Sequence, residues 1–109
     1  MIPVDMSKYI KALQAEDAYQ KNGKNAITIF KSDRITITLI ALKGGQYFQP
    51  GQEAGEATMS LQVLSGALSF ESMDSIVQLH AGHLLAFNHQ LAFNASALEV
   101  SICLLTLFK

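Results

Sequence analysis

Three histidines, His80, His83 and His89, lie within ten residues and form the densest group of side chains that could do chemistry. Histidine is the commonest metal ligand and a frequent acid–base catalyst. However, an H-x2-H spacing without further ligands at fixed distances is common by chance and matches no zinc signature. We expect His80 and His83 to flank a solvated turn at Ala81–Gly82. Only His89 is kept as a candidate site residue.

Two carboxylates and one thiol are the other candidates for catalysis. Glu53 and Glu56 lie in a glycine-containing polar segment and could form an acid–base pair, although acids in such a segment are usually just solvated. Cys103 lies in an apolar segment with no cation or histidine beside it, whereas a reactive thiol needs a lowered pKa. We therefore predict a buried, inert cysteine and assign no catalytic residue.

The composition excludes several classes of protein. The chain has 109 residues, of which 50% are hydrophobic and 16% charged, which fits one folded domain and excludes disorder. No Lys or Arg lies between Gly44 and Phe108, so most of the chain lacks the clustered cations that bind nucleic-acid phosphates. No apolar run reaches the roughly 20 residues of a membrane span. A single cysteine and the absence of a secretory leader pattern predict a cytoplasmic protein without a disulfide framework.

The elements that would position these residues follow two patterns. Residues 5–20 carry apolar side chains every three to four positions, which predicts a short amphipathic helix before a breaker at 22–25. From Ala26 onward, β-branched and aromatic residues alternate with polar ones between turns, which predicts strands. The expected strands span residues 26–31, 34–43, 57–65, 67–72, 76–79, 84–87, 91–95 and 98–108. The chain therefore divides into an N-terminal helical segment, residues 1–25, and a β domain, residues 26–109.

Several predicted strands are apolar on both faces, as where Leu39 precedes Ile40 and Leu104 precedes Leu105. In an antiparallel sheet one face normally meets water. We therefore expect the outer face to be covered by the N-terminal helix or by a second subunit, and we predict a homodimer.

Four segments carry a resemblance to a known family: LIALKGGQYF with Gly45, ATMSLQVLSGALSF with Gly66, LHAGHLLAF with Gly82, and SICLLTLF. In this order they resemble a small single-domain cupin of the RmlC-like jelly-roll superfamily. With the two preceding strands, the similarity covers about three quarters of the chain. The resemblance implies an all-β fold, a cupin-type jelly-roll β-barrel preceded by a short N-terminal helix, and commonly a dimer.

The chain departs from this family at the metal ligands. Cupins that bind metal use the motifs G-x5-H-x-H-x(3,4)-E-x6-G and G-x5-P-x-G-x2-H-x3-N. Aligned on Gly66, the first motif has Met59 in place of its glutamate and a histidine position near Glu53. Aligned on Gly82, the second has Phe93 in place of its histidine. Because a metal site needs about three or four converging donors, we predict that the metal site is lost and that no cofactor is bound.

Apolar side chains would then occupy the lumen of the barrel. The candidate ligand-binding residues are Glu53, Met59, Phe87, His89 and Phe93. Ligand pockets are usually apolar with few polar groups, and a lumen without nearby cations would not favour anionic sugars or nucleotides.

The sequence predicts a non-metal cupin that acts as a homodimeric module, either structural or binding a small apolar molecule, without defined catalysis. One alternative is a cupin enzyme for a small uncharged or weakly polar metabolite. It would be an isomerase or lyase, or would use a metal at a displaced site with His89 and Glu53. Another alternative is an oligomerisation or sensor element whose outer apolar face binds a partner.

Overall fold

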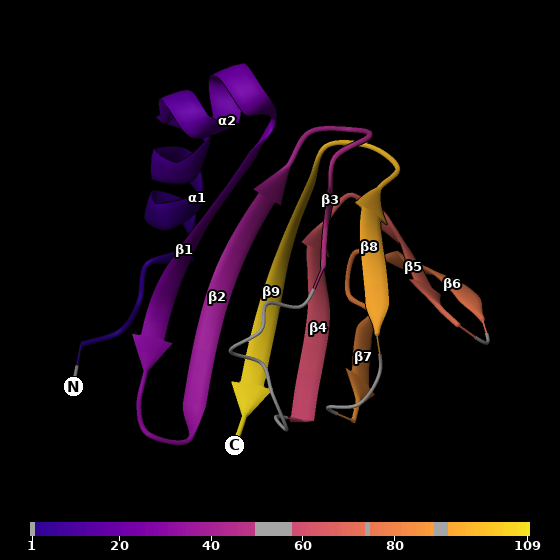
Figure 1. The fold of residues 1–109 in the computed structure, drawn as a ribbon. Coiled ribbons are helices and arrows are strands. Elements are labelled where there is room, and N and C mark those ends of the chain that lie inside the picture. The colour runs from indigo at the N-terminus through magenta and orange to yellow at the C-terminus, as the bar shows by residue number, and fades with distance from the viewer. Residues whose placement is uncertain (1, 50–57, 74, 89–91) are drawn as a thin grey trace.

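The computed structural model describes residues 2–49, 58–73, 75–88 and 92–109. Within these residues it has two helices and nine strands (Figure 1). The elements are α1 (Met6–Ala15), α2 (Asp17–Asn22), β1 (Lys24–Lys31), β2 (Ile35–Leu42), β3 (Tyr47–Phe48), β4 (Thr58–Ser65), β5 (Ala67–Ser72), β6 (Ile76–His80), β7 (Leu84–Phe87), β8 (Phe93–Ala97) and β9 (Ser101–Phe108). The predicted all-β fold with a helical N-terminus is confirmed.

The strands form two antiparallel sheets. The five-stranded sheet has the order β1-β2-β9-β4-β7, and the four-stranded sheet has the order β3-β8-β5-β6. Neighbouring strands in each sheet come from distant parts of the chain, as β2 pairs with β9 and β5 with β8. The main hydrophobic core lies between the two sheets, because it takes buried side chains from both.

The N-terminal region differs from the single helix that the periodicity predicts. The helix α1 begins at Asp5, whose carboxylate accepts a hydrogen bond from the Lys8 backbone N–H (3.2 Å), and it ends at Glu16 in an extended conformation. Glutamate is a good helix former, so the break has a tertiary cause. The amide of Asn25 donates to the Leu13 carbonyl oxygen (3.0 Å) and to the Glu16 carboxylate (2.8 Å), which ties this corner to β1.

The strand boundaries differ from the predicted ones at several points. The expected strands at 91–95 and 98–108 are shorter or shifted, because Leu98–Val100 forms the connection between β8 and β9. The strand β3 was not predicted, since two residues are too few to show an alternation. The strand β1 begins at Lys24, just after Gly23 ends α2 in the left-handed conformation (φ 77°).

The outer face of the five-stranded sheet is covered at one end by the helices. Leu13 and Tyr19 pack there against Leu39, Ala41 and Ile102 of β2 and β9. Away from the helices, the same face leaves Phe30 and Phe108 exposed. The apolar outer face was expected to be covered by the N-terminal helix or by a second subunit, and at this end the helices cover it. Among the described residues, no helix is long and apolar enough to cross a membrane.

A tight turn fixes one end of the core. Gly66, between β4 and β5, has φ 85°, and a Cβ atom there would collide with the Val100 carbonyl oxygen and the Ser101 side chain. The fully buried Ser101 hydroxyl accepts a hydrogen bond from the Ala67 N–H (3.1 Å) and donates one to the Glu99 carbonyl oxygen (2.8 Å). The turn at Gly66 and the segment before β9 meet here, and we call this the closed end of the barrel.

Candidate ligand-binding site

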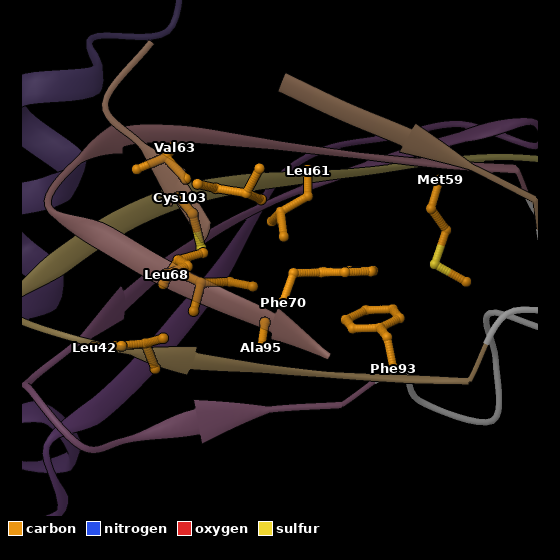
Figure 2. Close-up of a cluster of buried hydrophobic side chains, with 12 residues drawn as sticks. Leu42, Met59, Leu61, Val63, Leu68, Phe70, Phe93, Ala95 and Cys103 are labelled. Carbon is orange, nitrogen blue, oxygen red and sulfur yellow. The ribbon is translucent and has the colours of Figure 1, made fainter. Parts of the chain in front are cut away.

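The other end of the core contains four aromatic rings and one methionine, which we call the aromatic cluster. Phe93 stacks on Phe70 with ring centroids 4.9 Å apart, and it meets Phe87 edge-on at 5.1 Å. Phe48 approaches Phe93 at 6.0 Å, also edge-on. Figure 2 shows Met59, Phe70 and Phe93 at the same end of the buried cluster. The rings come from β3, β5, β7 and β8, so four strands contribute to one group.

The two-residue period of the strands places these side chains. In β4, Met59, Leu61 and Val63 are buried, while the intervening positions are at least partly exposed. Met59 lies directly opposite Phe87 in the β4–β7 ladder. In β5 the same alternation turns Leu68 and Phe70 inward. Facing strands thus bring the cluster together between the two sheets.

Three of the five predicted lumen residues lie in this cluster. Met59 and Phe93 are buried, with 1% and 5% of their surface exposed, and Phe87 is half-buried. Glu53 and His89 lie outside the described residues. Their predicted role in ligand binding remains a prediction, as does that of the three described residues.

Sequence reasoning did not assign Phe48 and Phe70 to the site. The inward position of Phe70 follows from the alternation with Leu68 in β5 and could have been predicted. Phe48 lies in a two-residue strand that pairs with β8 at Ala95, and no pattern of that length identifies the inward face.

Comparison with known proteins identifies the fold. No protein-family model and no curated protein matches the sequence. An RmlC-like cupin protein from Desulfovibrio desulfuricans superposes with a TM-score of 0.77 over 99% of this chain and 97% of its own, at 15% identity. The chain has the cupin fold. The predicted jelly-roll architecture is therefore confirmed.

Two other solved structures that are similar to this chain belong to proteins with different functions. A salicylate 1,2-dioxygenase from Pseudoaminobacter salicylatoxidans gives a TM-score of 0.79 at 11% identity, over 96% of this chain and 34% of its own. The Cupin_2 domain of an XRE family transcriptional regulator from Enterobacter cloacae gives 0.69 at 15% identity, over 80% of this chain and 97% of its own. Identities this low show the fold alone.

The donors of a metal-binding cupin are not found at the two motif positions that the structure describes. Met59 and Phe93 replace a glutamate and a histidine, and together they offer one thioether, a soft and weak donor. Within residues 2–49, 58–73, 75–88 and 92–109, no group of three or more His, Cys, Asp or Glu side chains could hold a metal ion. Met59 and Phe93 therefore do not supply the nitrogen and oxygen donors that these two positions give in metal-binding cupins.

The histidines of the β6–β7 turn are exposed, as predicted. The His80 backbone N–H donates to Nδ1 of His83 (2.9 Å), and the His83 N–H donates to the His80 carbonyl oxygen (2.9 Å). His83 thus stabilises the turn through both its ring and its backbone.

Cys103 is buried at the closed end of the cupin barrel. Desolvation raises the pKa of its thiol from 9.0 to about 12, so the thiolate is not formed near neutral pH. The prediction of a buried cysteine is confirmed, and its environment disfavours a nucleophile.

Proposed function

We propose that this cupin barrel binds a small, uncharged, apolar molecule at the aromatic cluster, without a metal and without defined catalysis. The observation that supports this most directly is the pair Met59 and Phe93, which place apolar groups where cupin motifs place ligands, within a group of four aromatic rings. The chain carries no Lys or Arg between Gly44 and Phe108, so the adjoining segments have no cation to balance an anionic ligand.

The geometry of the rings favours a flat ligand. Aromatic pairs gain about 0.5–1.5 kcal/mol beyond area burial when they stack with an offset or meet edge-on, and the rings of Phe70, Phe87 and Phe93 lie 4.9–5.1 Å apart. A planar apolar molecule can make the same two contacts with these rings, offset stacking and edge-on packing. Phe48 and Phe87 are only half-buried, so part of the cluster remains accessible from solvent.

A ligand panel tests this proposal. Indole and toluene should raise the thermal unfolding temperature in a concentration-dependent way, because a ligand that binds only the folded state stabilises it. Glucose 6-phosphate should have no effect. A Phe93→Leu variant should lose the response to indole, whereas Leu68→Met, a change of similar volume at the closed end, should keep it. The proposal is wrong if neither neutral probe shifts the transition in the wild-type protein.

We further propose that the barrel is a homodimer joined through the exposed part of the outer face of the five-stranded sheet. Phe30 lies opposite Ile37, and Ile35 lies opposite Phe108, on a face where β2 and β9 carry no charged residue. Phe30 is 51% exposed and Phe108 is 43% exposed in the single chain. Apolar surface of this kind, adjacent to the part that the helices already bury, is typical of a protein interface.

Light scattering coupled to size exclusion measures this association. At low protein concentration, the wild-type protein should have twice the mass of the chain, and Phe30→Lys should give a monomer. A matched Ser69→Lys variant on the four-stranded sheet should remain dimeric. A monomeric wild-type protein at all concentrations would contradict this interface.

The enzyme alternative rests on His89 and Glu53, which lie outside the described residues. The similarity to a dioxygenase structure makes it worth testing, and elemental analysis of untagged protein would support it by finding stoichiometric metal. The sensor alternative is likewise kept, because a cupin domain of a transcriptional regulator has a similar fold. A cytoplasmic location remains part of the proposal.

A further inference from the structure

The strand β6 forms one edge of the four-stranded sheet and is unusually unprotected. Among the described residues it pairs only with β5, in a regular register from Ala67–His80 to Glu71–Ile76. Its sequence, IVQLH, contains no Lys, Arg, Asp, Glu or Pro, and Ile76 is 69% exposed. In Figure 1 it lies at the end of the molecule remote from the helices. Natural edge strands usually carry charges, prolines or bulges that prevent pairing with another chain.

The edge strand β1 of the other sheet shows such protection. It has lysines at both ends, Lys24 and Lys31, and a bulge between Thr28 and Phe30. The edge strands β3 and β7 are only two and four residues long. Of the four edges, β6 alone combines a regular register, five residues and no charge.

The hydrogen bonds fix which backbone groups of β6 face outward. The Ser72 N–H donates to the Ser75 carbonyl oxygen (2.9 Å), so this is a hydrogen-bonded pair of the β5–β6 hairpin. Such pairs alternate with non-hydrogen-bonded ones in an antiparallel ladder. Val77 and Leu79 therefore turn their N–H and C=O groups toward β5. Ile76, Gln78 and His80 turn theirs away from it.

The outward groups of His80 are already hydrogen-bonded to His83. His83 receives the His80 N–H on Nδ1 and donates its own N–H to the His80 carbonyl oxygen, at 2.9 Å in each case. Ile76 and Gln78 have no outward partner among the residues that the structure describes. The edge therefore offers two donors and two acceptors, and it ends at His80.

We propose that β6 pairs in an antiparallel manner with β6 of a second copy of this chain. The two-fold axis would pass beside Val77, so that Ile76 faces Gln78 of the partner subunit and Gln78 faces Ile76 of the partner subunit. This register makes four hydrogen bonds and is the one that uses all the outward groups. A register with Gln78 facing Gln78 of the partner subunit would need the backbone N–H and C=O of His80 to form any more hydrogen bonds than Gln78 alone allows. Both groups of His80 are already hydrogen-bonded to His83.

The charges of the described residues around this edge permit the pairing. The nearest charged side chain of the β5–β6 ladder is Glu71, which pairs with Ile76. In the joined sheet, Glu71 and its symmetry mate would be three strands apart, about 14 Å at the usual strand spacing. That separation exceeds the Debye length of about 8 Å at physiological ionic strength. The result would be a continuous eight-stranded sheet.

This association goes beyond the proposed dimer and does not depend on it, because the two use different sheets. Four hydrogen bonds and a five-residue strand bury less surface than a standard interface of about 800 Å² per partner. We therefore expect a weaker, concentration-dependent association. Together with the outer-face dimer, it would give tetramers or larger assemblies.

Amide hydrogen exchange of the wild-type protein tests the proposal without a mutation. The amides of Val77 and Leu79 should be protected at every protein concentration, because they bond to β5. The amides of Ile76 and Gln78 should exchange at least tenfold more slowly at 1 mM than at 5 μM protein. If these two amides exchange at the same rate at both concentrations, the proposal is overturned.

A proline variant gives the second test. In Gln78→Pro the lost N–H points away from β5, so the hairpin keeps its hydrogen bonds, whereas two of the four intermolecular bonds disappear. The Gln78→Thr control keeps the N–H. Measured by sedimentation in the Phe30→Lys background, which removes the outer-face dimer, the association constant should fall at least tenfold for proline and less than twofold for threonine. Equal association of both variants would overturn the pairing.

Discussion

The two ends of the space between the sheets are filled by different kinds of side chain (Figure 2). At the closed end, the side chains of Leu42, Val63, Leu68 and Cys103 are aliphatic or small and fully buried. At the other end, rings meet at 4.9–6.0 Å, and Phe48 and Phe87 are half-buried. Aliphatic packing beside the Gly66 turn fixes the two sheets together. Flat rings at a partly accessible end present faces that another flat molecule could contact.

If the closed end contributes most of the stability, a substitution at the Gly66 turn should give the largest loss in the free energy of unfolding. Gly66→Ala must adopt φ 85° and collides with the backbone of Val100, so we expect a loss of about 3–5 kcal/mol in the free energy of unfolding. Gly45→Ala is the matched control, because its φ is 88° but no atom lies within 4 Å. It should cost about 1–2 kcal/mol. Urea denaturation measures both, and equal losses would show that the close approach at Gly66 is not a tight constraint.

The buried hydroxyl of Ser101 should give the next largest effect. Ser101→Ala leaves the buried Ala67 N–H without its acceptor, which typically costs about 1–3 kcal/mol. The control is Ser69→Ala on the half-buried outer side of β5, where the loss should stay below about 0.5 kcal/mol. If the two serine variants unfold at the same urea concentration, the hydrogen bonds of Ser101 contribute nothing to the closed end.

A change at the aromatic end should affect binding more than stability. Phe93→Leu keeps an apolar side chain of roughly similar volume and should cost about 1 kcal/mol. It removes the ring that stacks on Phe70, so the rise in unfolding temperature with indole should disappear. Calorimetric titration of indole into the folded variant checks this result. A variant that binds indole as the wild-type protein does would place the ligand elsewhere.

The sequence predicted most of the framework and part of the site, for physical reasons that differ between residues. The inward positions of Met59 and Phe93 follow from strand alternation and from the spacing to Gly66 and Gly82, which are local properties. The break at Glu16 depends on Asn25, nine residues away, and no helix propensity reports such a contact. The outward groups of β6 likewise depend on the pairing partner of each residue, so the sequence of β6 alone does not reveal an open edge.

The smallest expected effect is that of the Cys103 thiol on the pH dependence of the free energy of unfolding. It tests whether water is excluded from the closed end. Burial raises the pKa of the thiol from 9.0 in the unfolded chain to about 12 in the folded protein, so the folded state keeps a proton that the unfolded state loses. The stability due to this group is therefore complete below pH 9 and is lost as the pH rises from 9 toward 12. Other groups titrate in this range, so the test is the difference between the wild-type protein and Cys103→Ala.

Between pH 7.5 and 10.5, the free energy of unfolding measured with urea should fall more steeply in the wild-type protein than in Cys103→Ala. Parallel curves would mean that the thiol ionises equally easily in both states, which requires water or a cation beside it. The closed end would then be as accessible as the aromatic end. A steeper wild-type curve would instead support a barrel that is sealed at the Gly66 turn, leaving the aromatic end as the one open to a ligand.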